Sequence, residues 1–312
     1  MRYLVTGGAG FIGSNTVDEL VRRDHSVAVL DDFSAGKEQN LRDAVGRIEL
    51  FRGSITDLAA VRKACNGTDY VIHLAARTSV PDSVKDPLET NRTNIEGTLN
   101  VLVAARDAKV RRVVYAASCA AYGETLELPN RESMTPAPIS PYGLTKLVGE
   151  LYAGVFGRCY GLETVSLRYF NVFGPRQDPG SPYSGVLSKF MLALIEGKQP
   201  VVFGDGEQSR DFIFVGNVVQ ANLLACEAPG VTGGVFNIGS GARFTLNKTL
   251  RLLEKISGKH AAAKYEPPRA GDILHSQADI SISRKMLDYN PSVGFEEGLR
   301  RTWDWYSSPF RM

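Results

Sequence analysis

Cysteine and histidine are scarce in this sequence. Four cysteines occur among 312 residues without a Cys-x-x-Cys pair, and four histidines are scattered along the chain. Disulfide scaffolds need a higher density of cysteine, and zinc ligands usually stand close together in sequence. The composition therefore predicts neither a disulfide framework nor a metal site.

An excess of charge of one sign is also absent. The chain carries 36 Lys and Arg against 34 Asp and Glu, which gives a formal net charge of +2. Such a balance produces no global field that would hold a nucleic-acid backbone or an anionic membrane surface. We expect no nucleic-acid partner, and we expect any anionic ligand to be held by local groups.

Long hydrophobic runs are missing as well. No apolar stretch approaches the roughly 20 residues that span a membrane. The first residues, MRYLVTGGAG, lack the charged and then apolar layout of a signal peptide. We therefore expect no membrane partner and a cytoplasmic location.

The first half of the chain alternates short β-branched runs with helical stretches, which is typical of βαβ units. The sequence predicts an α/β fold with a doubly wound (Rossmann) parallel sheet of six or seven strands. Strands are expected at 2–6, 26–30, 48–51, 70–74, 112–116 and 164–167, and helices at 12–23, 57–65, 91–108 and 142–159.

The composition of the chain changes after about residue 171, where a stretch rich in Pro, Gly and Ser begins. We expect residues 1–170 to form the sheet domain and residues 171–312 to form a smaller α/β lobe, with some segments interleaved with the first domain. Expected elements of the lobe are helices near 185–197, 217–227 and 245–257, short strands at 200–203 and 235–238, and a loop at 267–276.

Three glycines, Gly7, Gly10 and Gly13, lie where the first expected strand meets the first helix. Their spacing lets the backbone turn tightly and approach a pyrophosphate at the helix N-terminus. Asp31 ends the next strand, 18 residues after Gly13. A carboxylate there accepts hydrogen bonds from both adenosine ribose hydroxyls and repels a 2′-phosphate, so the pattern favours NAD over NADP.

Tyr142 and Lys146 stand four residues apart, which places both side chains on one face of a helix. A neighbouring ammonium, reinforced by the positive nicotinamide of NAD⁺, would lower the phenol pKa from its usual value of about 10. Ser118 lies at the carboxyl edge of the sheet, where doubly wound folds bind ligands. Its hydroxyl could share a proton with the same substrate oxygen.

These motifs together resemble the extended short-chain dehydrogenase/reductase family, and more narrowly its nucleotide-sugar epimerases of the UDP-glucose (UDP-galactose) 4-epimerase type. The similarity covers essentially the whole chain, because further segments follow the family's order and spacing. They are HLAA at 73–76, SPYGLTK at 140–146, LRYFNVFGPRQDP at 167–179, FGDGEQSRDFIFV at 203–215, FNIGSG at 236–241 and RAGDILHS at 269–276.

The resemblance implies that residues 1–170 bind NAD and that residues 171–312 bind a nucleotide sugar. Ser54 stands where the family often has an aspartate that contacts adenine, so this contact departs from the common pattern. The implied cofactor residues are Gly7, Gly10, Phe11, Ile12, Gly13, Asp31, Asp32, Ser34, Gly36, Ser54, Ile55, Leu74, Ala75, Ala76, Asn94, Tyr142, Lys146 and Tyr169.

The family contains epimerases, 4,6-dehydratases, decarboxylases and reductases, all of which begin by oxidising sugar C4. Its dehydratases carry an Asp-Glu pair after the catalytic Ser or Thr, and its decarboxylases carry a Glu. Cys119 and Ala120 occupy that place here, so the carboxylic acid for elimination or decarboxylation is missing. Epimerisation at C4 is the expected reaction, and Cys119 is expected to be a small buried hydrophobe.

In the implied mechanism Tyr142 takes the proton of the C4 hydroxyl with help from Ser118, while the C4 hydride passes to NAD⁺. The 4-keto sugar then turns about its diphosphate linkage and receives the hydride on its other face. Lys146 is implied to hold the nicotinamide ribose and to lower the phenol pKa.

The resemblance also implies a substrate pocket in the second lobe. Its arginines would clamp the diphosphate, Asn171 would bind the phosphates near the sugar, and Asp272 would receive the uridine ribose. Val201 and Phe203 would form the wall on which uracil rests. The implied substrate residues are Ser79, Ser118, Cys119, Ala120, Tyr142, Asn171, Val186, Val201, Phe203, Arg210, Arg269, Asp272 and Ser276.

Ser276, seven positions beyond Arg269, stands where the resembling epimerases face the sugar C2 substituent. A serine leaves room for an N-acetyl group, so UDP-N-acetylglucosamine is expected to be tolerated beside UDP-glucose. UDP-glucuronate is less expected, because Asp178 replaces the second arginine of the family's Pro-Arg-Gln-Arg loop and would repel a sugar carboxylate.

Other interpretations stay open. They are a UDP-glucuronate 4-epimerase, a dTDP-sugar epimerase, an NAD-dependent reductase or decarboxylase, and a dinucleotide-sensing module without catalysis. Gly216 and Asn217 replace the family's aspartate after RDFIFV, which predicts weaker hydrogen bonds at the lobe cap. The resemblance further implies a homodimer through a four-helix interface formed by helices 91–108 and 142–159.

Overall fold

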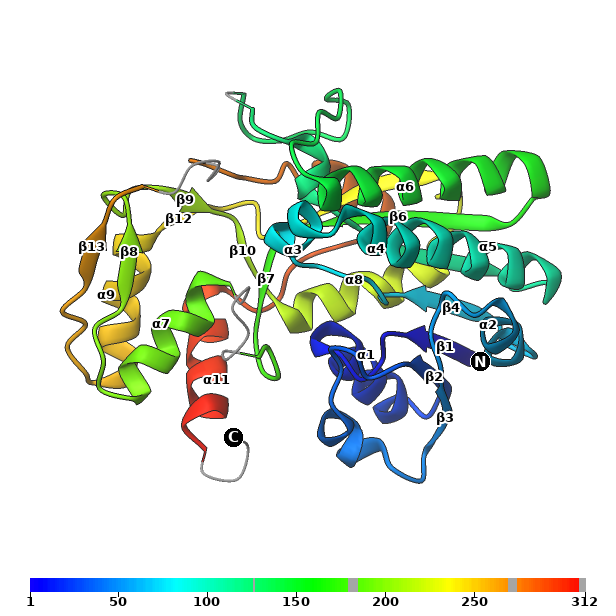
Figure 1. Cartoon of the computed structure of the whole chain (residues 1–312), viewed down its shortest axis with the longest axis horizontal. Helices are drawn as coiled ribbons and strands as arrows, with labels where there is room; N and C mark the ends of the chain where they lie inside the picture. Colours follow the sequence, from blue (N-terminus) through cyan, green and yellow to red (C-terminus); the bar gives the residue numbers. More distant parts are fainter. Residues whose placement is uncertain (126, 179–184, 269–273, 309–312) are drawn as a thin grey trace.

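A computed structural model describes residues 1–125, 127–178, 185–268 and 274–308, and its larger part is one parallel sheet (Figure 1). The seven strands confirm the predicted sheet, and their order is β11-β6-β5-β4-β1-β2-β3, an order typical of doubly wound folds. They are β1 (Arg2–Thr6), β2 (Ser26–Asp31), β3 (Ile48–Arg52), β4 (Tyr70–His73), β5 (Arg112–Ser118), β6 (Glu163–Tyr169) and β11 (Gly234–Ile238).

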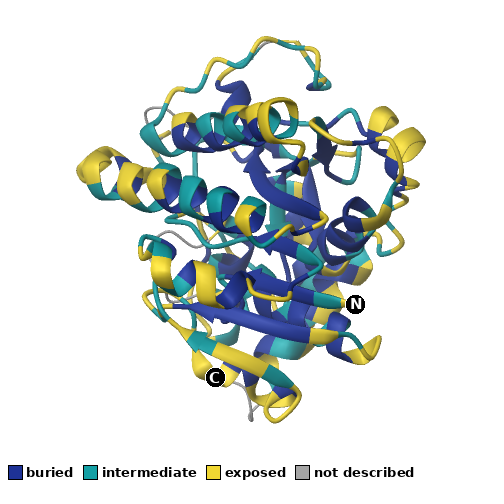
Figure 2. Ribbon diagram, turned by 90° about the vertical axis from the view of Figure 1, so that its right-hand side faces the viewer, coloured by how far each residue is buried: buried dark blue, intermediate teal, exposed yellow. Residues whose placement is uncertain are grey.

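Helices cover both faces of this sheet, because successive side chains of a strand point to opposite sides. Tyr3 and Val5 of β1 belong to the core cluster shared with α1 (Phe11–Arg22) and α8 (Val215–Glu227). Leu4 belongs to the cluster on the other face. That face is covered by α2 (Leu58–Cys65), α5 (Gly97–Asp107) and α6 (Pro141–Tyr160). Figure 2 shows the buried sheet between helices whose outer sides are exposed.

The smaller lobe has its own apolar core, formed by three helices and the aromatic rings of short strands (Figure 1). Phe173, Phe212 and Phe295 pack against one another at ring-centroid distances of 5.3 to 6.4 Å. The helices are α7 (Val186–Ile195), α9 (Leu246–Ser257) and α11 (Phe295–Ser307). The paired strands are β7 (Asn171–Phe173) with β10 (Phe212–Phe214), β8 (Val201–Phe203) with β13 (Lys264–Glu266), and β9 (Ser209–Arg210) with β12 (Phe244–Thr245).

Short helices connect these elements. The helix expected at 91–108 begins earlier, at Pro87, and contains a wider π-helical turn before α5. The short helices are η1 (Glu38–Ala44), α3 (Val80–Lys85), α4 (Pro87–Asn91), η2 (Arg92–Glu96), η3 (Cys119–Tyr122) and α10 (Ser281–Leu287).

Among the described residues, no helix is both long enough and apolar enough to cross a membrane.

The strand expected at 235–238 was assigned by its sequence position to the smaller lobe, but the structure places it in the large sheet. It is β11, which pairs in parallel with β6 at the edge of that sheet. Phe236 and Ile238 are buried there in the same core cluster as Val218 and Val219 of α8. Burial of these side chains against the first domain explains why the chain returns to it.

The loop after β7 ties the second lobe to the first domain. Arg176, a non-glycine residue with φ +72°, places its guanidinium 2.6 Å from Asp18 of α1 and 3.2 Å from Asp43 of η1. Lys37 pairs with Asp178 at 2.8 Å. These ion pairs hold the loop after β7 against α1 and against the segment that follows β2.

Candidate active site

The glycine turn after β1 is a cradle that side chains would fill. Gly7 has φ +69°, and a Cβ on it would lie 2.8 Å from the Cα of Ala75. A Cβ on Gly13 would lie 2.1 Å from the carbonyl oxygen of Gly7. Glycine at these positions therefore allows α1 to begin directly against the ends of β1 and β4.

The N-terminus of α1 fits a pyrophosphate. Gly10 is its N-cap, no side chain caps the helix, and its first turn contains no acidic residue. The first N–H groups of a helix have no partner within the helix and carry the positive end of its dipole. Gly10, Phe11, Ile12 and Gly13 lie at this end, as the sequence motif predicted.

Asp31 is held beside the glycine turn and is only 7% exposed. Its Oδ2 accepts a hydrogen bond from the Ala9 amide and its Oδ1 accepts one from the Phe33 amide, both at 2.8 Å. A Cβ on Gly36 would lie 2.9 Å from Oδ1, so the following loop passes close to the carboxylate. Burial raises the pKa of Asp31. Each carboxylate oxygen retains a lone pair for a ribose hydroxyl.

The loops after β2, β3 and β4 supply the remaining cradle positions. Asp32 accepts hydrogen bonds from the amide and hydroxyl of Ser34. The Ser54 hydroxyl accepts one from Thr56, while the Ile55 side chain is buried. Leu74, Ala75 and Ala76 follow β4, and the amides of Leu74 and Ala75 both donate to Thr6 of β1.

Two of the predicted cofactor residues have side chains engaged elsewhere. Asn94 is buried, and its amide group bonds to both backbone groups of Arg77 and to the Thr145 hydroxyl. The Tyr169 hydroxyl donates to Asn222 of α8 at 2.5 Å. Asn94 thus links the loop after β4 to α6. Only the ring and backbone of Tyr169 remain for a ligand.

Ser118 and Tyr142 are brought together by the packing of α6 on η3. Ser118 ends β5, and its hydroxyl accepts a hydrogen bond from the Ala120 amide at 3.1 Å. A Cβ on Gly143 would lie 2.7 Å from the Ala120 carbonyl oxygen, so the first turn of α6 contacts η3 directly. Burial is the largest influence on the pKa of the Tyr142 phenol, and the nearby Ser118 hydroxyl acts in the opposite direction by lowering it.

Burial nevertheless dominates at Tyr142 and raises its pKa to about 12. Ser118 opposes this effect, whereas Cys119 adds to it. The Lys146 ammonium donates to a backbone carbonyl oxygen, that of Ala116. The expectation that Lys146, reinforced by the positive nicotinamide of NAD⁺, lowers the Tyr142 pKa stays a prediction.

Lys146 is 4% exposed, and its ammonium donates to the carbonyl oxygen of Ala116 at 2.8 Å. The same group lies 5.2 Å from the centre of the Tyr115 ring. Burial lowers the pKa of Lys146 to about 7. An ammonium has three donors, so this position suits a group that also holds ribose hydroxyls.

Cys119 and Ala120 follow Ser118 in η3, and both are half-buried. Cys119 packs against the main core cluster, and burial raises the pKa of its thiol to about 12. The thiol is therefore protonated at neutral pH.

Three predicted substrate residues of the second lobe meet in the structure. The side-chain Nδ2 of Asn171 donates to the Ser276 hydroxyl at 3.3 Å. The Ser276 amide donates to the carbonyl oxygen of Ser209, which also accepts from the Arg210 guanidinium at 3.0 Å. Arg269 and Asp272 lie outside the described residues.

The other predicted substrate residues lie on separate elements. Val201 and Phe203 stand two residues apart on β8 and share one face of that strand. Val186 begins α7. The Ser79 hydroxyl caps α3 by accepting a hydrogen bond from the Asp82 amide.

Two departures from the family pattern have a different consequence than expected. Asp178 pairs with Lys37, so its charge is compensated and its expected repulsion of a sugar carboxylate is weakened. The Asn217 side chain both donates to and accepts from the backbone of Val293, at 2.8 and 3.0 Å. Asn217 therefore makes a lobe-capping contact that the sequence comparison expected to be weak.

Sequence analysis overlooked Asp211, which follows Arg210 in the chain, directly precedes β10 and is fully buried. Its place directly after Arg210 in the SRDF segment is the sequence feature that could have indicated it.

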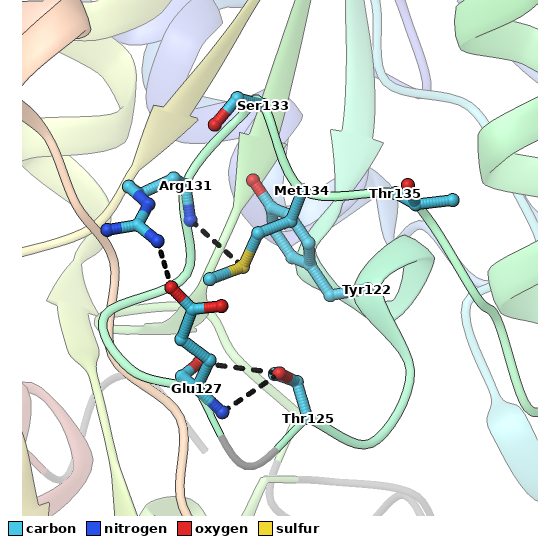
Figure 3. A pocket seen from close by; sticks show the side chains of 7 residues that line it. All are labelled: Tyr122, Thr125, Glu127, Arg131, Ser133, Met134 and Thr135. Carbon is cyan, nitrogen blue, oxygen red and sulfur yellow. Dashed lines mark hydrogen bonds and ion pairs between the residues drawn. The ribbon is translucent and has the colours of Figure 1, made fainter.

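A cavity of about 420 Å³ beside Tyr122, shown in Figure 3, is unrelated to the predicted site residues. Its polar groups bond to one another, as Glu127 does with Arg131 and Thr125. In the described parts of the chain, no three His, Cys, Asp or Glu side chains cluster as metal ligands.

Known proteins resemble this chain over nearly its whole length. Residues 3–239 match the model of the NAD dependent epimerase/dehydratase family. The UDP-N-acetylglucosamine 4-epimerase of Methanobrevibacter ruminantium, in complex with UDP-N-acetylmuramic acid, is 41% identical with a TM-score of 0.94, over 98% of this chain and 97% of that chain.

Two further solved structures agree. The UDP-glucose 4-epimerase of Thermotoga maritima with UDP-glucose is 40% identical, with a TM-score of 0.93 and 98% of each chain covered. The UDP-glucose 4-epimerase of Thermus thermophilus in complex with NAD is 37% identical, with a TM-score of 0.90, covering 99% of this chain and 100% of that chain.

The buried Lys146 predicts a pH dependence of stability. Its pKa is about 7 in the folded chain and about 10.4 in an unfolded chain. Between these values the unfolded state binds more protons, so the free energy of unfolding should rise with pH. Urea unfolding at pH 7 and pH 9 should show a larger rise for the unchanged chain than for Lys146→Met. Equal rises in both proteins would contradict the assigned pKa.

Proposed function

The chain belongs to the NAD-dependent epimerase/dehydratase family, and we propose that it interconverts the C4 epimers UDP-glucose and UDP-galactose through a 4-keto sugar. NAD is its cofactor. One observation carries the proposal: Ser118 and Tyr142 come together at the carboxyl edge of the sheet, where the Ser118 hydroxyl opposes the rise that burial causes in the phenol pKa, beside two half-buried residues that are not acids. That edge also carries the uncapped N-terminus of α1.

The residues of this chain perform proton transfer and positioning. Tyr142 takes the proton of the C4 hydroxyl and returns it to the 4-keto oxygen, while the Ser118 hydroxyl shares the hydrogen bond and stabilises the phenolate. Lys146 holds the nicotinamide ribose from its buried position. When bound, NAD⁺ supplies the acceptor for the C4 hydride and a positive charge that favours the phenolate.

The phenol needs that additional charge because burial, opposed by Ser118 and reinforced by Cys119, raises its pKa to about 12. A base with such a pKa is almost entirely protonated at neutral pH, whereas efficient general bases have pKa values near the working pH. The site is therefore poised to become basic only when its cofactor is present. This dependence couples proton removal to the presence of the hydride acceptor.

Cys119 and Ala120 support epimerisation over elimination or decarboxylation. Loss of water or of a carboxylate needs a further acid or base near C5 and C6 of the sugar. A thiol whose pKa is about 12 and a methyl group offer neither. The proposed reaction returns the hydride to the same sugar and consumes no external oxidant.

The small side chain of Ser276 favours tolerance of N-acetylated sugars. Its hydroxyl lies 3.3 Å from the Asn171 amide, so Ser276 stands at the proposed phosphate-binding group rather than apart from it. A hydroxymethyl side chain leaves space where a tyrosine would fill it. Similarity to a UDP-N-acetylglucosamine 4-epimerase supports the same proposal.

We further propose a homodimer through α5 and α6. Leu144, Leu151 and Val155 are exposed on α6, and Leu151 is 59% exposed. A helix face with three exposed apolar side chains is stabilised by association with a partner. Leu102 and Phe156, apolar residues of the same two helices, are instead buried in the core of this chain. The cytoplasmic location expected from the sequence stays a prediction.

Tyr142→Phe tests the proton acceptor. Turnover of UDP-glucose should fall by about 10²- to 10⁴-fold, the range typical of a lost general acid–base group, because the ring stays but the phenol is gone. NAD content per chain should be unchanged. Tyr160→Phe, at the exposed end of the same helix, is the matched control and should leave turnover unchanged. Near-normal turnover of Tyr142→Phe would exclude Tyr142 as the base.

Ser276→Tyr tests the C2 subsite. This variant should lose turnover of UDP-N-acetylglucosamine and keep that of UDP-glucose, because the ring would occupy the space of the N-acetyl group. Ser276→Ala keeps that space and should retain both activities. The measurement is chromatographic separation of the C4 epimers from a panel that also includes UDP-glucuronate and dTDP-glucose. Parallel loss of both hexose activities, or of neither, would place Ser276 away from C2.

Leu151→Glu tests the dimer. A buried charge would disfavour the proposed interface, so light scattering should give twice 34.0 kDa for the unchanged chain and the mass of one chain for the variant. Ile282→Glu, the same change at an exposed apolar position of α10, should remain dimeric. A mass near 34.0 kDa for the unchanged chain at micromolar concentration would rule the dimer out.

A further inference from the structure

Asp211 is a fully buried carboxylate to which four hydrogen bonds converge. Its Oδ1 accepts from the amide and the hydroxyl of Ser240, both at 2.7 Å. Its Oδ2 accepts from the amides of Gly241 and Ala278, both at 3.0 Å. The side chain is 0% exposed. One carboxylate thus joins the turn after β11 to the segment that contains Ser276.

The donors around Asp211 are neutral groups, unlike those of another buried carboxylate, Glu150, which pairs with the Arg168 guanidinium at 2.6 Å. Burial raises the pKa of Asp211 to about 6, so the group is ionised at neutral pH. An ionised carboxylate accepts hydrogen bonds at both oxygens, whereas a carboxamide has one accepting end and one donating end. The arrangement of four donors therefore requires the carboxylate form.

The backbone around Asp211 reaches the proposed substrate groups. Both the amide and the side-chain Nδ2 of Asn171 donate to the Asp211 carbonyl oxygen, at 3.1 and 3.2 Å. Nδ2 of Asn171 also donates to the Ser276 hydroxyl. Arg210 precedes Asp211 directly and donates to the carbonyl oxygen of Leu274 at 3.1 Å. Asp211 is therefore connected to three proposed substrate residues. It bonds to Asn171 directly, it follows Arg210 in the chain, and it bonds to the segment that contains Ser276.

Space around the carboxylate is tightly limited. A Cβ on Gly239 would lie 2.9 Å from Oδ2 of Asp211 and 2.6 Å from the Cβ of Ala278. The carboxylate therefore rests directly against the backbone at the end of β11. Movement of the carboxylate would shift the turn and the Ser276 segment together.

We infer that Asp211 is a positioning residue for the nucleotide-sugar diphosphate, which it serves by fixing Arg210, Asn171 and Ser276 in one arrangement. The inference rests on the proposed function for the nature of the ligand. The described hydrogen bonds of Asp211 go to Asn171, Ser240, Gly241 and Ala278, and none goes to Ser118, Tyr142 or the glycine turn. Its removal should therefore act on binding of the nucleotide part and spare proton transfer at Tyr142.

The test measures UDP binding by calorimetry, with the full chain carrying its NAD. In Asp211→Asn one end of the amide would meet N–H donors, so the UDP dissociation constant should rise about tenfold or more. NAD content should be unchanged. In turnover assays the KM for UDP-glucose should rise while kcat changes less than KM does. A merely structural role would instead reduce NAD content and kcat together with affinity.

Glu132→Gln is the matched control. Glu132 is a half-buried carboxylate that accepts a hydrogen bond from the backbone amide of Asn237 on β11 at 2.8 Å. Among the hydrogen bonds described, none joins the Glu132 side chain to the segment that contains Ser276. Its UDP affinity should match that of the unchanged chain. Gly239→Ala, which crowds Asp211 without altering charge, should weaken UDP binding as Asp211→Asn does.

Unchanged UDP affinity in Asp211→Asn overturns the inference, and if that variant does not fold, unchanged affinity in Gly239→Ala overturns it. Equal weakening by Glu132→Gln would also overturn it. A chain that binds UDP but epimerises no UDP-hexose would refute the proposed function, while the UDP comparison would still decide the role of Asp211. A chain that does not bind UDP at all would refute both.

Discussion

The common direction of seven strands is the constraint on which the site depends. Because all of them run parallel, their carboxyl ends meet at one edge, and Gly7, Asp31 and Ser118 come from three of those ends. The glycine turn brings α1 to this edge, since a side chain at Gly13 would collide with the Gly7 carbonyl. Segments far apart in sequence thereby form one cradle, in which the Ala9 amide bonds to Asp31 and the Ala75 amide bonds to Thr6.

The proposed substrate groups depend on a second arrangement, in which the chain leaves the sheet after β6 and returns to it as β11. The return places the turn after β11 beside β9 and β10, where the Asp211 carboxylate connects it to the segment that holds Ser276. Arg176 and Lys37 close the same lobe onto α1, η1 and the loop after β2. The proposed cofactor and substrate groups are thus fixed to one another through ion pairs and buried hydrogen bonds between the lobes.

Local patterns predicted the parts of this structure that depend on local chemistry. The β-branched runs predicted the strands of the sheet, and the glycine spacing predicted the tight turn between β1 and α1. The roles of Asp31, Tyr142 and Lys146 stay predictions. Burial and tertiary contacts were not readable in the same way. The sequence placed β11 in the wrong lobe and overlooked Asp211, because pairing partners and convergent amides arise only when distant segments pack.

The central claim is that one chain removes and returns the same C4 hydride while Tyr142 removes and returns the proton. It is tested most directly with UDP-glucose that carries deuterium at C4, incubated with the purified chain in ordinary water without added cofactor. The account predicts UDP-galactose that retains deuterium at C4 in essentially every molecule. Protium from solvent at C4, or a requirement for added NAD or NADH in each turnover, would contradict it.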